Sequence, residues 1–133
     1  MTRGRFLATA DVPAEPVPFG TTRWLSRPET SGARDLAVVE VTLEPGQGHA
    51  FHHHPNQEEV IYVVAGEVEQ WLERERRTLG PGDGVFIGKG VVHASFNAGA
   101  GPARLVAILG PCVGASGYEV VAVAHESPWR ELG

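Results

Sequence analysis

Short apolar segments separated by turn residues make up most of the chain after residue 35. The segments are rich in valine, isoleucine and aromatic residues, which are favoured in β-strands. They run over residues 36–43, 59–64, 68–72, 85–87, 91–97 and 104–109. Glycine and proline clusters stand between them, and these residues provide the backbone conformations of tight turns. The pattern predicts many short strands joined by close connections.

Helical periodicity is not seen along the chain until residues 129–132. Short strands without crossover helices are typical of antiparallel sheets that close on themselves and so remove exposed edges. We therefore expect an all-β fold, a small antiparallel β-barrel or double-sheet jelly roll. Residues 36–112 are expected to form the barrel, and residues 113–133 a C-terminal strand and tail that complete the same domain.

Residues 1–35 have a different composition. This stretch contains Pro13, Pro16, Pro18 and Pro28 and few apolar runs. Proline-rich segments favour extended conformations. We expect an extended N-terminal arm that lies across another part of the protein.

Composition excludes several classes of function. Lys and Arg number 11 against 16 Asp and Glu, a net charge of −5, so the chain lacks the basic balance of nucleic-acid-binding proteins. No apolar run approaches the roughly 20 residues that span a bilayer. Cys112 is the single cysteine, so no intrachain disulfide forms, and a lone cysteine is more often a small apolar residue than a reactive one. We expect a cytoplasmic protein without a nucleic-acid or membrane partner.

Four of the six histidines lie between His49 and His54. Alternate side chains of an extended strand share a face, so His52 and His54 project to the same side. Imidazole suits divalent zinc, copper, iron and nickel, and a carboxylate compensates the charge of the ion. Glu58 or Glu59 can supply that carboxylate, and alternation does not choose between them, because both faces of their strand are apolar.

His93 offers a third imidazole from the later segment 91–97. Taken alone, it would more often be a hydrogen-bonded core histidine than a metal ligand. A closed barrel, however, brings distant strands around one interior point. His93 is therefore a candidate to complete the group.

The spacing of these residues resembles the two sequence motifs of the cupin superfamily. The first motif is Gly, five residues, His-x-His, three or four residues, Glu, six residues and Gly. Its positions are matched by Gly46, His52, His54, Glu59 and Gly66. Glu58 would need a seventh residue before the final glycine, so the motif spacing selects Glu59.

The second motif is Gly, five residues, Pro-x-Gly, two residues, His, three residues and Asn. Its positions are matched by Gly82, Gly90, His93 and Asn97, while Gly88 stands where the family usually has proline. The departure at Gly88 loosens a turn and removes no ligand. Asn97 is expected to be structural.

The resemblance implies a barrel that holds one divalent metal ion per chain, with positions left open to water or substrate. The implied ligands are His52, His54, Glu59 and His93. Three imidazoles and one carboxylate describe a reactive site more than a closed structural one. Iron, manganese, zinc, nickel and copper all suit this ligand set.

Three further polar residues are candidates for contact with a substrate. Gln57 precedes the acidic pair and Gln70 follows Gly66 on the next strand. Ser95 shares a face with His93 by alternation, which makes it a residue expected to line the pocket.

Two function hypotheses follow. The first is a metal-dependent enzyme acting on a small organic molecule in an oxygenase-type or lyase/isomerase-type reaction. The alternative is a non-catalytic module that binds a small molecule through its metal. A homodimer is also expected, because the segment 60–64 is apolar on both faces and a partner would cover its outer one.

Overall fold

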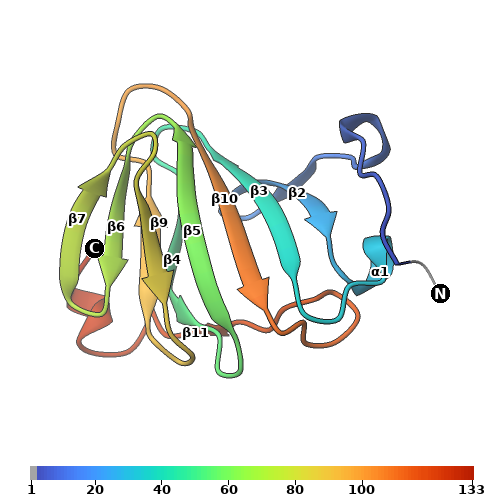
Figure 1. Ribbon diagram of the computed structural model, residues 1–133. Coiled ribbons are helices and arrows are strands. Elements are labelled where there is room, and N and C mark those ends of the chain that lie inside the picture. The colour runs from blue at the N-terminus through green and yellow to red at the C-terminus, as the bar shows by residue number, and fades with distance from the viewer. Residues whose placement is uncertain (1–2) are drawn as a thin grey trace.

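Two antiparallel sheets form the fold in the computed structural model, which describes residues 3–133. The elements in chain order are η1 (Thr9–Asp11), β1 (Glu15–Val17), β2 (Gly20–Ser26), α1 (Pro28–Ser31), β3 (Ala37–Leu43), β4 (Gly48–His53), β5 (Glu58–Ala65), β6 (Val68–Leu72), β7 (Glu75–Leu79), β8 (Gly84–Ile87), β9 (His93–Phe96), β10 (Ala103–Gly110), β11 (Val121–Ala122) and η2 (Trp129–Glu131). One sheet has the order β1-β2-β3-β10-β5-β8 and the other the order β11-β4-β9-β6-β7. Figure 1 shows β2 and α1 at one end of the strand array and β6 and β7 at the other. The predicted all-β jelly roll is confirmed.

The helical elements are short. The α1 helix has four residues, and η1 and η2 have three each. None of the described helices has the length and apolar character needed to cross a bilayer.

All six apolar segments predicted as strands contain a strand in the structure. These strands are β3, β5, β6, β8, β9 and β10. Burial alternates strictly along β5 and β10, as it does when one face of a sheet is packed and the other is open. Leu105, Ala107 and Leu109 lie on the buried face of β10, and their partners across the ladder are Val63, Ile61 and Glu59. The face of β5 that carries Glu59 therefore faces the interior.

The predicted N-terminal arm contains two strands of the larger sheet, β1 and β2. Strand β2 pairs with β3 along most of its length, and its residues Thr22 and Trp24 are buried in the barrel. The sequence pattern misses β2 because its segment is mainly polar and lies between prolines. The second half of the expected arm is thus part of the barrel wall.

The C-terminal segment covers the outer face of the smaller sheet. Strand β11 pairs with β4, and the backbone N–H of Val123 donates to the carbonyl oxygen of Phe51 at 3.0 Å. Trp129 and Leu132 pack against a small apolar cluster that includes Phe51 and Trp71. This covering gives the smaller sheet a second apolar layer outside the barrel.

The outer face of the larger sheet is apolar and exposed. Val60 stands between Phe86 and Ile108 across the ladders of β8 and β10. Phe86 is 58% exposed, and Tyr62 on the same face of β5 is 46% exposed. Contiguous apolar side chains on a sheet face are typical of an association surface.

Gly88 stands at a turn where the second motif usually has proline, and the stability of this turn can be tested by substitution. It is not among the glycines with positive φ, and a Cβ at this position would lie 3.6 Å from Val91 Cγ2, an ordinary contact. Proline there would restrict the unfolded chain, so we expect Gly88→Pro to raise the free energy of unfolding by about 0.4–1 kcal/mol, measured by urea denaturation. Gly90, with φ of 73°, is the matched control, because proline cannot adopt that φ and Gly90→Pro should destabilise the protein. A Gly88→Pro variant less stable than the parent would contradict the prediction.

The exposed face of the larger sheet predicts a homodimer. Multi-angle light scattering at micromolar concentration should give twice the mass of one chain, and Phe86→Glu should shift the protein to monomer by placing a charge in the interface. Val121, which is 42% exposed on the other sheet, offers the control Val121→Glu, and that variant should remain a dimer. A parent protein that is monomeric under these conditions would refute the prediction.

Candidate metal centre

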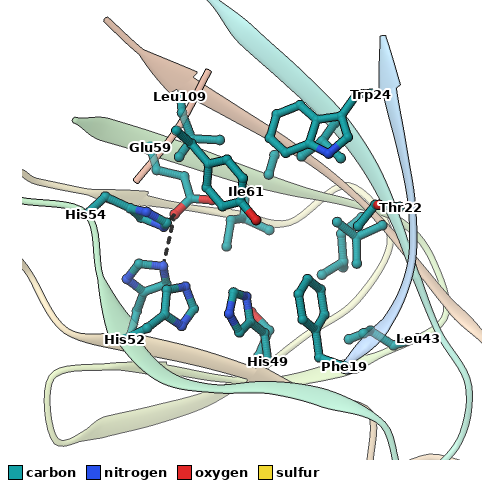
Figure 2. Close-up of a pocket in the computed structure, with 17 residues that line it drawn as sticks. Phe19, Thr22, Trp24, Leu43, His49, His52, His54, Glu59, Ile61 and Leu109 are labelled. Atoms are coloured by element: carbon teal, nitrogen blue, oxygen red, sulfur yellow. Dashed lines mark ion pairs between the residues drawn. The ribbon is translucent and has the colours of Figure 1, made fainter. Parts of the chain in front are cut away.

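The four residues expected to bind a metal converge inside the barrel, and all four are buried. His52 lies on β4 and is the ladder partner of His93 on β9. His54 follows the end of β4, and Glu59 projects inward from β5. Figure 2 shows the side chains of His52, His54 and Glu59 directed toward one point.

One nitrogen from each of His52, His54 and His93 lies within 4.8 Å of the others. Glu59 Oε1 is 3.3 Å from His54 Nε2 and 2.9 Å from His93 Nε2. The neighbouring Glu58 is exposed on the outer face. This is the register that the motif spacing predicts.

A backbone carbonyl orients each of the three imidazoles. The Nδ1–H groups donate to the carbonyl oxygens of Ala50, Glu119 and Val91 at 2.6, 2.7 and 3.0 Å, from His52, His54 and His93 respectively. A carbonyl oxygen only accepts hydrogen bonds, so each Nδ1 carries the hydrogen. The Nε2 atom of each neutral ring is therefore left as an acceptor, the form in which histidine binds metals.

Three buried polar atoms at the centre have no hydrogen-bond partner within residues 3–133. They are Nε2 of His54, Nε2 of His93 and Oε1 of Glu59. With Nδ1 protonated, the lone pairs of these nitrogens face a carboxylate oxygen across about 3 Å. Such a group of acceptors is repulsive unless a cation lies among them.

The electrostatics of the site favour a positive charge between His54 and Glu59. Burial lowers the pKa of His52 to about 2, so its ring stays neutral. Burial also opposes a charge on His54, but the nearby Glu59 carboxylate outweighs it and raises the pKa of that ring. Burial alone would raise the pKa of Glu59, whereas His54 and His93 hold it well below its usual range. The carboxylate therefore remains ionised in the interior.

A divalent metal ion fits this donor set. Ligand atoms about 2.1 Å from one ion lie roughly 3.0–3.4 Å apart when the angle between them is between 90° and tetrahedral. The 2.9 and 3.3 Å separations from Glu59 Oε1 fall close to that range. The three histidines could thus hold an ion, with the carboxylate compensating part of its charge.

The four side chains line one part of a cavity whose other walls are mostly apolar. The cavity is lined by Phe19, Thr22, Trp24, Val39, Val41, Leu43, His49, His52, His54, Glu59, Ile61, His93, Ser95, Leu105, Ala107, Leu109 and Tyr118. Figure 2 shows Trp24 and Thr22 on the side of the cavity away from His52 and His54. A ligand in this space would meet its polar contacts mainly at the metal-binding end.

The cavity includes a fourth histidine that the sequence analysis did not select. His49 and His52 are three residues apart, and strict alternation would place them on opposite faces of β4. The ladder between β4 and β9 shifts register between these two residues, so both have inward-facing partners, Ser95 and His93. Burial lowers the pKa of His49 to about 4. A β-bulge is not visible in the hydrophobic pattern, which is why His49 was missed.

Ser95 lines the cavity as expected, while Gln70 does not. The Ser95 hydroxyl donates to Gln70 Oε1 at 2.6 Å, and Gln70 Nε2 donates to the Trp71 carbonyl at 3.1 Å. Gln70 thus supports Ser95 from behind the cavity wall.

Gln57 lies away from the cavity, in contrast to the expected substrate contact. Its Nε2 donates to the carbonyls of Pro111 and Gly117 at 2.8 and 2.9 Å, and its Oε1 accepts from the Glu119 N–H at 3.2 Å. All its polar atoms are thereby bound to backbone. The buried amide fixes the segment that contains Tyr118.

Asn97 and Cys112 also lie outside the cavity lining. Asn97 Nδ2 donates to the carbonyls of Leu43 and Gly101, both at 2.8 Å, which is the structural role expected of it. Cys112 packs against the main apolar core, and burial raises the pKa of its thiol. A raised pKa disfavours the reactive thiolate.

Comparison with protein-family models matches residues 39–109 to the cupin domain. Among curated proteins, Protein SchB of Streptomyces halstedii is 38% identical over 109 residues, which cover 82% of this chain and 79% of SchB. Tetracenomycin polyketide synthase protein TcmJ of Streptomyces glaucescens is 29% identical over 92 residues, 69% of this chain and 62% of TcmJ. The chain therefore matches less than two thirds of TcmJ.

Solved structures share the fold. The polyketide cyclase RemF from Streptomyces resistomycificus superposes with a TM-score of 0.76 at 24% identity, covering 96% of this chain and 91% of RemF. KdgF from Halomonas sp. superposes with a TM-score of 0.74 at 23% identity, covering 84% of this chain and 96% of KdgF.

The two adjacent glutamates provide a test of the centre. Glu59→Gln preserves shape but removes the anionic oxygen between His54 and His93. We expect zinc affinity, measured by titration of chelator-stripped protein, to fall about 100-fold or more, because loss of an outer-sphere partner alone costs roughly 10–100-fold. Glu58→Gln is the matched control and should bind zinc as the parent does. The reverse order of the two affinities would show that the ligand register is wrong.

Proposed function

The chain belongs to the cupin domain family, and on that premise we propose that it is a metal-dependent enzyme acting on a carbonyl group of a small, largely apolar molecule. The observation that carries the proposal is the group of unpartnered acceptors at one end of an apolar cavity. Nε2 of His54, Nε2 of His93 and Oε1 of Glu59 face one another without hydrogen bonds among the described residues. His52, His54, His93 and Glu59 would hold one divalent ion there.

A metal ion bound at this point supplies a Lewis acid that polarises a carbonyl oxygen. The chain itself supplies the surroundings of that oxygen. Leu43, Ile61 and Leu105 line the cavity and would hold the hydrocarbon part of a substrate away from water. Burial raises the pKa of Tyr118, so its hydroxyl stays protonated and is suited to donate a hydrogen bond to a substrate oxygen.

An intramolecular aldol reaction suits these groups. A proton leaves the carbon next to one carbonyl, that carbon bonds to a second carbonyl carbon, and the oxygen of the second carbonyl takes up a proton. Loss of water can follow, and no oxidant is needed. This is chemistry of the lyase/isomerase type, and of the two reaction types expected from the sequence it needs no co-substrate.

The names of similar proteins support a polyketide-type substrate. RemF is described as a polyketide cyclase, and TcmJ as a tetracenomycin polyketide synthase protein. Polyketides carry several carbonyl groups on a carbon chain, which matches a cavity with one polar end and apolar walls. We extend this substrate class to the present chain as part of the proposal.

The linear triketone heptane-2,4,6-trione provides a direct assay. Intramolecular aldol closure and loss of one water convert it to orcinol, which is separable by chromatography. Protein purified without an affinity tag should be stripped with a chelator and reloaded separately with zinc, manganese, iron, nickel or copper. We expect orcinol to form faster with at least one loaded form, and the acceleration to disappear with chelator or in His93→Asn.

Glu58→Gln, on the outer face, is the matched control and should retain the activity of the loaded parent. If the loaded protein binds the triketone in calorimetry but does not accelerate cyclisation, the non-catalytic binding module is favoured instead. Failure to take up any of the five metals at neutral pH would overturn the metal dependence itself.

A further inference from the structure

His49 lies inside the barrel beside the proposed metal ligands. The register shift in β4 turns it to the same side as His52, and its ladder partner is Ser95. Figure 2 shows the His49 ring between those of His52 and Phe19, directed into the cavity. This inward position comes from the backbone and needs no ligand to maintain it.

Two aromatic contacts hold the His49 ring in place. It stacks on His52 with ring centres 3.6 Å apart and an interplanar angle of 16°, and on Phe19 with centres 4.0 Å apart and an angle of 2°. Ring stacking of this kind restricts rotation without using the ring nitrogens. His49 is thus oriented by its faces, whereas His52 is also oriented through Nδ1.

The ring nitrogens of His49 remain available. No hydrogen bond with another described residue involves them, and neither nitrogen is among the fully enclosed unpartnered atoms of residues 3–133. His49 also lies outside the group of three histidines whose nitrogens come within 4.8 Å of one another. A neutral imidazole has one donor and one acceptor, and the His49 ring that carries them lines the cavity.

We propose that His49 is a substrate-binding residue that forms a hydrogen bond with a second oxygen of the substrate, next to the oxygen that meets the metal centre. The inference rests on the proposed function and specifies the class of substrate more closely. The preferred ligand would carry a further oxygen for His49, on a position next to the ketone whose oxygen meets the metal centre and on the same planar or nearly planar unit. Ser95, across the ladder from His49, is available as an additional acceptor on the same wall.

Two aromatic ketones test this selectivity. Both 2′-hydroxyacetophenone and 2′,6′-dihydroxyacetophenone present a hydroxyl and a ketone to the metal centre, and only the second has another hydroxyl for His49. Their dissociation constants would be measured by calorimetry on the zinc-loaded full chain. His49→Phe keeps a flat ring in the stack but removes both nitrogens, while His49→Gln keeps a donor and an acceptor without the ring.

We expect the preference of the parent for the dihydroxy ketone to fall about three- to tenfold in His49→Phe, the effect of one neutral hydrogen bond. His49→Gln should keep most of the preference, and a purely structural role for His49 would not produce that rescue. Zinc content and melting temperature of His49→Phe should match the parent. His125→Phe, at a 74% exposed histidine, is the control and should leave the preference unchanged.

Equal preference in the parent and His49→Phe would overturn the inference and leave the proposed function intact. Loss of zinc from His49→Phe would also overturn it, by assigning His49 to the metal centre. Failure of the zinc-loaded parent to bind either ketone would count against the proposed function, and the inference would fall with it.

Discussion

Three hydrogen bonds from imidazole to backbone determine the chemistry available inside this barrel. Each one places the hydrogen of a histidine on Nδ1 and so directs an unshared electron pair at Nε2 toward the interior. The accepting carbonyls belong to Ala50, Val91 and Glu119, which lie in three separate parts of the chain. Two of them come two residues before the histidine that they bind. The third comes from the C-terminal segment and depends on how that segment packs.

The buried carboxylate of Glu59 gives the interior its negative charge. A lone ionised carboxylate in an apolar interior is strongly unfavourable, and the histidines beside it must compensate that charge through a proton or a metal ion. The raised pKa of His54 and the lowered pKa of Glu59 have this common cause. The apolar walls increase the effect, because they keep water from screening the charges.

The sequence predicted the strands and the candidate ligand group more fully than the rest of the cavity. The strands could be predicted because their segments are rich in valine, isoleucine and aromatic residues. The motif glycine Gly66 has φ of 75°, and a Cβ at this position would lie 2.8 Å from Ala103 Cα, which is too close. Such positions can be identified in the sequence because few residues other than glycine can occupy them. The inward turn of His49 left none, since a β-bulge inserts a residue without changing the amino-acid types around it. Strand β2 was missed because its segment is mainly polar and lies in a proline-rich stretch, so the buried face that carries Thr22 and Trp24 does not stand out as apolar.

Gln57 connects the C-terminal segment to the centre of the barrel. It binds the backbone on both sides of Tyr118, and the carbonyl of Glu119 in that segment accepts the hydrogen bond from His54. The residues matched by the family end at 109, so Gln57 lies within the matched region and the segment that it binds lies beyond it. Coupling free energies between two sites are reciprocal. An interaction that orders residues 117–119 would therefore also stabilise the orientation of His54. A ligand at the centre that requires this orientation would equally stabilise the ordered form of residues 117–119. The C-terminal segment lines the site only through Tyr118, yet its conformation would affect how strongly the site binds. Substitutions in this segment could therefore change the binding affinity without replacing a metal-binding residue.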